Sequence, residues 1–107
     1  MFKIGTDIVL IPRIEKSISS ERFLKSVYTQ NEIKYCKSPA SFAGIFAAKE
    51  ALLKALGTGI KGKLSEYEVL HDELGKPYFN GVANCDVSIS HDGDYAVASV
   101  ILWGENL

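Results

Sequence analysis

The sequence contains little cysteine, and it has no long apolar run. Its 107 residues include two cysteines, Cys36 and Cys85, which are far apart and form no CxxC pair. This spacing argues against a disulfide scaffold, and two cysteines with two histidines form no zinc-ligand pattern. We therefore expect a reduced protein with both thiols buried. The longest apolar run, residues 42–48, is far below the ~18 residues that a membrane span needs.

The first residues also lack the apolar core of a signal peptide, because Lys3, Gly5 and Asp7 interrupt it. Hydrophobic residues make up 47% of the chain and charged residues 23%, which excludes disorder, collagen and a coiled coil. The length fits one domain with one modest core. The prediction is a cytoplasmic protein with a single domain over residues 1–107.

Charge is divided unevenly along the chain. Residues 1–63 hold 11 of the 12 basic residues and 5 acidic ones, a net charge of +6, whereas residues 64–107 carry a net charge of −7 from one lysine and 8 acids. The two halves either neutralise each other within the fold or between subunits, or present a basic surface to an anionic partner. The overall balance does not indicate nucleic-acid binding.

The clearest element is a helix over residues 39–56. Ser38 is a favourable N-cap, Pro39 suits the first position, and Gly57 is a natural stop. One face carries large apolar residues and another carries a stripe of alanines at 43, 47, 51 and 55, so we expect a central helix that packs on two sides.

The remaining segments predict an α+β fold. Short helices are expected around 13–17 and 22–27, and a capping box at 29–32 opens a helix that reaches about residue 36. The pattern favours strands at 3–11, 66–71, 77–79, 86–91 and 95–103, with a hairpin turn at 92–94. The sheet should be largely antiparallel and packed on the long helix, whereas the pairing of the first strand is left open.

Three charged residues suggest a cation site. Asp7 lies within an apolar strand, and Glu50 lies on the long helix one turn before Lys54. If the strand is at an edge, Asp7 can simply face water, and Glu50 and Lys54 can form an ordinary surface pair. Alternatively, the two carboxylates converge on magnesium, which takes one or two carboxylates and fills its other sites with water and phosphate oxygens.

The loop at 57–63 and His91 are further candidates. The loop resembles a Walker A motif, but Leu64 replaces the required Ser or Thr and the loop follows a helix, so a P-loop NTPase is excluded. Glycine amides and lysines in this region remain suited to phosphate, although a helix-ending loop explains them equally well. His91 is either a turn residue or a general acid/base, and His71 is interpreted as structural.

Together these segments resemble one family. They occur in the order and spacing of bacterial holo-acyl-carrier-protein synthase, a 4′-phosphopantetheinyl transferase, over nearly the whole chain. The matching stretches are IGTDIVLIPRIEK (4–16), RFLKSVYTQNEIKYC (22–36), FAGIFAAKEALLKALGTGI (42–60), ELGKPYFNG (73–81) and VSISHDGDYAVASVIL (87–102).

The resemblance implies transfer of phosphopantetheine from coenzyme A to a serine of apo-acyl carrier protein, with release of adenosine 3′,5′-bisphosphate. It also implies a 4′-phosphopantetheinyl transferase-like fold and a homotrimer with sites between protomers. The implied roles are Mg²⁺ ligands (Asp7, Glu50), catalytic residues (Glu50, Lys54, His91), coenzyme contacts (Lys54, Gly57, Thr58, Gly59, Lys76, Pro77, Ser90, His91) and carrier-protein contacts (Arg13, Arg22).

Two departures from the family pattern affect the coenzyme site. Ile45 replaces the arginine of AGRFAAKEA, so Lys49, Lys61 or Lys63 is expected to substitute for it, and Asp92 replaces a common Thr or Ser. The base for the acceptor serine is either Glu50 or a metal-bound water. Two other functions use the same residues: a non-catalytic module that binds acidic proteins or anions, and a magnesium-dependent phosphohydrolase.

Overall fold

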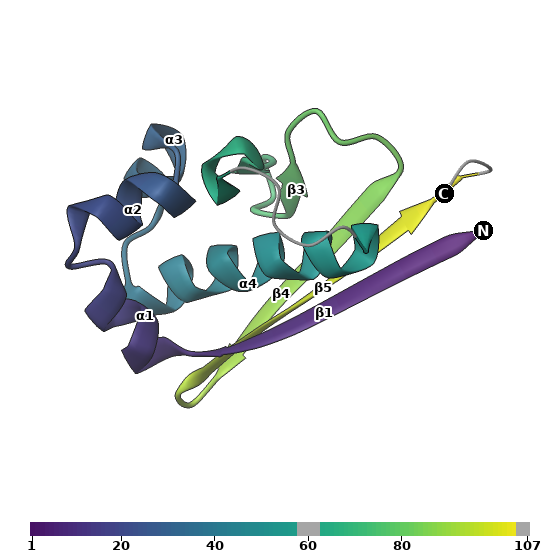
Figure 1. Cartoon of the computed structure of the whole chain (residues 1–107). Coiled ribbons are helices and arrows are strands. Elements are labelled where there is room, and N and C mark those ends of the chain that lie inside the picture. The colour runs from purple at the N-terminus through teal and green to yellow at the C-terminus, as the bar shows by residue number, and fades with distance from the viewer. Residues whose placement is uncertain (58–62, 105–107) are drawn as a thin grey trace.

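The structure, a computed structural model, describes residues 1–57 and 63–104. Its main sheet has the strand order β1-β5-β4, from β1 (Phe2–Leu10), β5 (Tyr95–Trp103) and β4 (Cys85–Asp92). Both pairings are antiparallel, with Asp7 opposite Ala98 and Ala98 opposite Ile89. The pairing of the first strand, which the sequence leaves open, is thus antiparallel, and β1 is an edge strand (Figure 1).

The long helix α4 (Pro39–Leu56) lies across one face of this sheet and packs on β1 and β5 (Figure 1). The Ser38 side chain accepts a hydrogen bond from the Ser41 amide, and Gly57 ends the helix in the left-handed conformation at φ 71°. Both predicted helix signals are confirmed. The alanine stripe is buried, and it lets the backbones of α4 and β1 approach closely at Gly5.

Three short helices precede α4 and gather near its N-terminal end (Figure 1). They are α1 (Ile11–Ser17), α2 (Glu21–Val27) and α3 (Gln30–Tyr35). The predicted capping box is confirmed, because the Thr29 hydroxyl accepts from the Glu32 amide while the Glu32 carboxylate accepts from the Thr29 amide.

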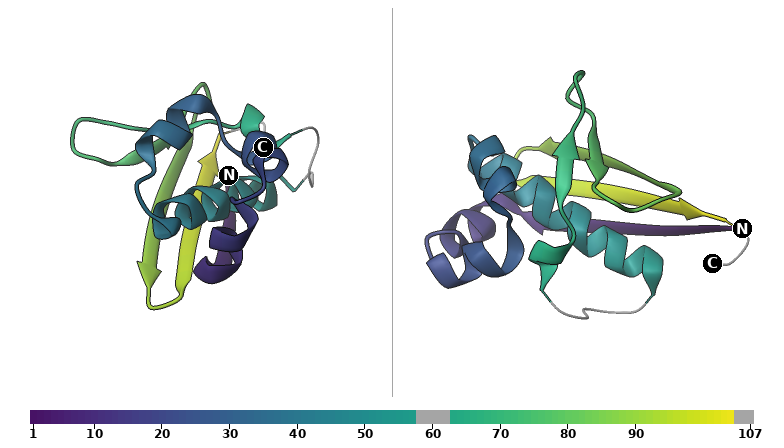
Figure 2. Two further views of the ribbon diagram at one scale, coloured as in Figure 1. Left: turned by 90° about the vertical axis from the view of Figure 1, so that its left-hand side faces the viewer. Right: turned by 90° about the horizontal axis from the view of Figure 1, so that it is seen from above.

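A second sheet of two strands, β2 (Val69–His71) and β3 (Pro77–Phe79), forms a hairpin that projects beside the main sheet (Figure 2). The predicted strand at 66–71 is wrong in its first half. The 3-10 helix η1 (Leu64–Glu66) reaches Glu66, the first residue of that segment, and buries Leu64, and β2 begins only at Val69. The predicted strand at 3–11 also ends one residue early, because Ile11 begins α1 and donates its amide to the Asp94 carbonyl.

The face of the main sheet opposite α4 carries no helix among the described residues (Figure 2). Alternation along the paired strands places on it a set of exposed apolar side chains, hereafter the open sheet face: Phe2, Ile4, Ile8, Leu10, Tyr95, Ile101 and Trp103. No described helix is both long enough and apolar enough to cross a membrane.

The two cysteines are both free thiols. Cys36 is buried, and burial raises its pKa to about 12. Cys85 is only half-buried, so the expectation of two buried thiols is confirmed for Cys36 alone. His71 stacks on Tyr35, with ring centroids 3.7 Å apart and an interplanar angle of 9°.

Candidate active site

Asp7 points from β1 toward α4, on the same side of the strand as Gly5 and Val9. Its side chain is 15% exposed, so the alternative of an edge-strand residue facing water is wrong. The Lys54 ammonium lies 3.0 Å from Asp7 Oδ1 and also donates to the Thr6 carbonyl oxygen at 3.0 Å. Two segments that are 47 residues apart therefore meet at this carboxylate.

Glu50 lies on α4 one turn before Lys54 and is half-buried. Burial raises the pKa of Glu50, the nearby charge of Asp7 raises it further, and Lys54 opposes both effects. The effect of Asp7 requires the two carboxylates to be close to one another. Among the described residues, Lys54 forms its ion pair with Asp7 and not with Glu50, so the simple i,i+4 pair is not what the fold builds.

The donors of this cluster fit a hard dication. Two carboxylates and one ammonium leave a net negative charge, and carboxylate oxygens are the ligands that Mg²⁺ prefers. The described residues hold no group of three or more potential protein ligands. Mg²⁺ needs only one or two protein carboxylates, because it keeps water and substrate phosphate as its other ligands.

Gly57 ends α4 one turn after Lys54, which places the start of the predicted coenzyme loop beside the cluster. Thr58, Gly59 and Lys61, the other residues predicted for this loop, lie outside the described residues. Lys63 is exposed just before η1.

The remaining predicted coenzyme contacts lie on the other side of the main sheet's central strand. Lys76 ends the β2–β3 turn and Pro77 begins β3, and Lys76 Nζ forms an ion pair with Asp86 Oδ1 on β4. They border a cavity of about 440 Å³ that is also lined by Ser88, Ser99 and Ile101 from β4 and β5. Strand β5 separates β4 from β1, so one protomer does not bring these residues to Asp7.

Ser90 and His91 lie near the end of β4, opposite Val97 and Ala96 of β5. Both are exposed, and their side chains point to opposite faces of the sheet. Because β5 again lies between them and Asp7, they too sit apart from the carboxylate cluster within one protomer. Arg13 and Arg22 are exposed on α1 and α2, as a docking role requires.

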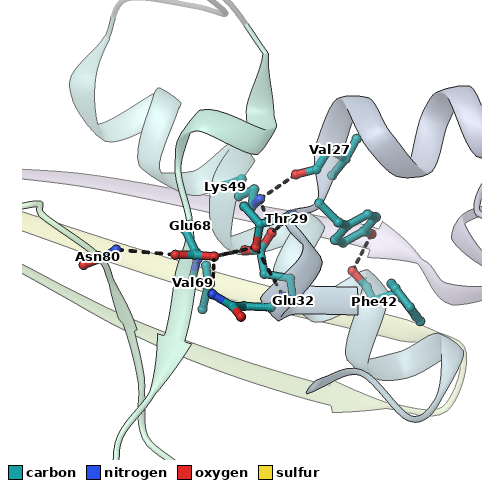
Figure 3. Close-up of polar contacts among 10 residues, drawn as sticks. Val27, Thr29, Glu32, Phe42, Lys49, Glu68, Val69 and Asn80 are labelled. Atoms are coloured by element: carbon teal, nitrogen blue, oxygen red, sulfur yellow. Dashed lines mark hydrogen bonds and ion pairs between the residues drawn. The ribbon is translucent and has the colours of Figure 1, made fainter. Parts of the chain in front are cut away.

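Lys49 is the prediction that the structure overturns, because it cannot substitute for the arginine that Ile45 replaces. Its side chain is fully buried and donates to Glu32 Oε1 at 2.7 Å and to the Val27 carbonyl (Figure 3). Burial lowers the pKa of Lys49, while the hydrogen bond that Lys49 donates to Glu32 opposes that shift. Ile45 itself is buried in the core.

The sequence reasoning did not anticipate the network that Lys49 belongs to. The Glu32 carboxylate accepts from the Thr29 amide, the Lys49 ammonium and the Val69 amide, so it joins α3, α4 and β2 (Figure 3). The capping box signalled the first of these contacts. No local sequence pattern indicates the contacts with Lys49 and Val69, which lie 17 and 37 residues from Glu32 in the chain.

Comparisons with known proteins agree with this architecture. A family model described as the 4′-phosphopantetheinyl transferase superfamily matches residues 3–100. A holo-[acyl-carrier-protein] synthase of Fusobacterium nucleatum is 42% identical, with 92% of this chain and 96% of that protein covered. The synthase of Nautilia profundicola is 44% identical, with coverages of 92% and 97%.

Solved structures show the same fold. The synthase of Bacillus anthracis in complex with CoA (3′,5′-ADP) superposes with a TM-score of 0.82 at 39% identity, covering 94% of each chain. The Helicobacter pylori synthase in complex with coenzyme A has a TM-score of 0.82 at 33% identity, with coverages of 91% and 96%.

The α+β fold and these matches define a transferase of the 4′-phosphopantetheinyl transferase superfamily. Within it, the chain belongs to the holo-[acyl-carrier-protein] synthase family, as predicted from its motifs, and it is an enzyme.

Proposed function

We propose that this enzyme transfers the 4′-phosphopantetheine group of coenzyme A to a serine of apo-acyl carrier protein in a Mg²⁺-dependent reaction. The observation that carries the proposal is the meeting of Asp7, Glu50 and Lys54 at the junction of β1 and α4. Coenzyme A is the bound molecule in two solved relatives of the same fold, which supports it as the donor.

The reaction needs alignment and charge stabilisation more than covalent chemistry. The serine Oγ forms a bond to the phosphorus next to pantetheine, and the bond from that phosphorus to the bridging oxygen breaks. The bridging oxygen leaves with adenosine 3′,5′-bisphosphate, and the serine proton goes to a base. Mg²⁺ held by Asp7 and Glu50 would supply stabilisation of the developing negative charge.

Glu50 is the base candidate that this chain supplies. Its carboxylate is half-buried beside the cluster, and an oxygen that the cation does not use could accept the serine proton. Lys54 adds a cation for the diphosphate. The runner-up base is water held at the cation.

The acceptor is an acidic carrier protein, and the basic residues of the first three helices suit it. Arg13 and Arg22 are exposed on α1 and α2, within a half of the chain whose net charge is +6. Complementary charge steers such an encounter and makes it sensitive to salt. The enzyme would act in the cytoplasm and support fatty acid biosynthesis.

The complete site would form between protomers of a homotrimer. Ser90, His91, Lys76 and Pro77 are separated from Asp7 by β5 in one protomer, and a neighbouring copy can supply them. The open sheet face supports association, since Ile4 and Ile8 are 73% and 60% exposed on an apolar surface.

The experiment is a mass measurement on apo-acyl carrier protein incubated with enzyme, coenzyme A and Mg²⁺. The expected result is a gain of one phosphopantetheine group, which chelation of Mg²⁺, Asp7→Ala or Glu50→Ala abolishes without unfolding the enzyme. Full activity in both variants would refute the metal site. Release of phosphopantetheine to water would identify a hydrolase, and salt-sensitive binding without turnover would identify a binding module.

A further inference from the structure

Lys54 is hydrogen-bonded to the same Asp7 carboxylate oxygen that a bound cation would need. Its ammonium contacts Asp7 Oδ1 at 3.0 Å and the Thr6 carbonyl oxygen at 3.0 Å. Both acceptors are hard oxygens of the kind that Mg²⁺ binds. A dication bound through Asp7 Oδ1 would therefore meet the ammonium already hydrogen-bonded to that oxygen.

The two partners of this ion pair differ in freedom. The Asp7 side chain is 15% exposed and is fixed on a strand paired with β5, whereas the Lys54 side chain is 57% exposed. An exposed lysine on a flexible stem loses little when it leaves such a pair. Lys54 is thus the partner that can move, and Asp7 is the one that stays.

The net charge of the cluster indicates the stage at which Lys54 should leave Asp7. Asp7 and Glu50 contribute two negative charges, and Lys54 offsets one of them. A dication added with Lys54 still in place would leave one positive charge in excess. A bound coenzyme diphosphate would remove that excess and would offer Lys54, which lies one turn before the Gly57 end of α4, new acceptors.

We propose that Lys54 is the resident counter-ion of Asp7, and that its exchange from Asp7 to the coenzyme diphosphate couples cation binding to coenzyme binding. This inference rests on the proposed function, because it requires the cation at Asp7 and Glu50. Lys54 then acts twice. It opposes cation binding to the free enzyme, and it promotes cation binding once the diphosphate has arrived.

The test is titration of the full-length protein with Mn²⁺ alone, followed by the free-ion electron paramagnetic resonance signal. Lys54→Met should bind Mn²⁺ about tenfold more tightly than the unaltered protein, because the competing ammonium is gone. Lys54→Arg keeps a cation and should stay within about twofold of the unaltered protein. Lys25→Met removes one charge from the exposed Lys25–Glu21 pair and should change nothing.

A second titration includes coenzyme A, corrected for Mn²⁺ that coenzyme A binds without protein. Coenzyme A should tighten Mn²⁺ binding more in the unaltered protein than in Lys54→Met, which has no lysine to displace. Unchanged or weaker Mn²⁺ binding by Lys54→Met overturns the proposal.

Asp7→Asn separates this failure from failure of the metal site itself. If Asp7→Asn weakens Mn²⁺ binding while Lys54→Met leaves it unchanged, the metal site stands and the exchange is refuted. If Asp7→Asn binds Mn²⁺ as tightly as the unaltered protein, the proposed metal site fails, and the exchange fails with it.

Discussion

Glu50 occupies a position where its negative charge lowers the stability of the fold. Burial and the charge of Asp7 raise its pKa, so the folded state holds its proton more tightly than the unfolded chain does. The stability that this group contributes is therefore present below its ordinary pKa and is lost as pH rises through its folded-state pKa. At neutral pH the ionised Glu50 carboxylate therefore lowers the free energy of unfolding.

Glu50→Gln should accordingly raise the melting temperature at pH 7.5 by about 1–3 °C while transfer activity is lost. The gain should shrink as pH falls and disappear below about pH 4, where the native glutamate is protonated and as neutral as glutamine. Circular dichroism melts between pH 4 and 8, with a chelator present, measure the difference.

The control is Glu15→Gln, which neutralises an exposed glutamate of α1 and should not reproduce this pH dependence. A Glu50→Gln variant that is less stable at pH 7.5, or a difference that is constant with pH, would contradict the electrostatic account of Glu50.

Lys49, Glu50 and Lys54 on α4 show which features of the candidate site can be predicted from the sequence. Glu50 and Lys54 could be selected from residue type and spacing, and Asp7 from its place in an apolar strand. Lys49 has the same chemistry as Lys54, yet it faces the interior, because its partner Glu32 lies 17 residues away on another helix. Burial of a charge depends on a distant partner, and local spacing carries no information about that partner.

Among the elements, the close approach of β1 to α4 brings Asp7 beside the helix that carries Glu50 and Lys54. A Cβ at Gly5 would lie 1.9 Å from the Ala51 carbonyl oxygen and 2.6 Å from the Ala55 amide nitrogen. These are backbone atoms of the helix that carries Glu50 and Lys54. Gly5 is two residues from Asp7 on the same side of the strand, so it determines how near Asp7 comes to that helix.

Gly5→Ala should destabilise the protein by about 1–3 kcal/mol, since strand and helix must separate. Gly44→Ala is the matched control at the contact between α4 and β4. There the Cβ meets only the Ile89 Cγ2 atom at 2.8 Å, and alanine is the better helix former by about 1 kcal/mol, so the net change should be smaller. Urea unfolding compares the two, and equal destabilisation would contradict the role of close approach at Gly5.

The buried ion pair holds α3, α4 and β2 together. Lys49→Met should cost about 3–5 kcal/mol in the free energy of unfolding, because it leaves the Glu32 carboxylate buried without its cation. Adding Glu32→Gln should recover part of that loss, as no buried charge remains. Lys25→Met, at an exposed pair, should cost less than about 1 kcal/mol.

Chemical denaturation of these variants measures the costs. A Lys49→Met protein as stable as Lys25→Met would show that the ion pair contributes nothing to the fold.

Elements with strong end signals could be predicted, and elements fixed by distant contacts could not. The cap at Ser38, Pro39 and the left-handed Gly57 bound α4 within the local sequence. The strand expected at 66–71 begins only at Val69, and Glu66 instead ends the 3-10 helix η1, whose Leu64 is buried. The antiparallel pairing of β1 with β5 joins opposite ends of the chain, so no local pattern encodes it.

The exposed apolar side chains of the open sheet face predict that copies of this protein associate with one another. Ile8→Glu places a charge on this face, on the edge strand β1, and should convert the proposed trimer into monomers, as measured by light scattering after size exclusion, with an unchanged circular dichroism spectrum. Transfer activity should fall with assembly, because the proposed site takes residues from a neighbouring protomer.

Ser19→Glu adds the same charge at an exposed position between α1 and α2 and should leave the trimer intact. Monomeric unaltered enzyme with full activity would contradict a site shared between protomers.

The most direct test of the whole account is an anomalous-scattering map from crystals of the full-length enzyme grown with coenzyme A and Mn²⁺. The account predicts a peak bound by carboxylate oxygens of both Asp7 and Glu50 and by a coenzyme phosphate oxygen, at roughly the 2.0–2.2 Å of such cations. A peak held by other residues, or by the coenzyme without either carboxylate, would contradict it.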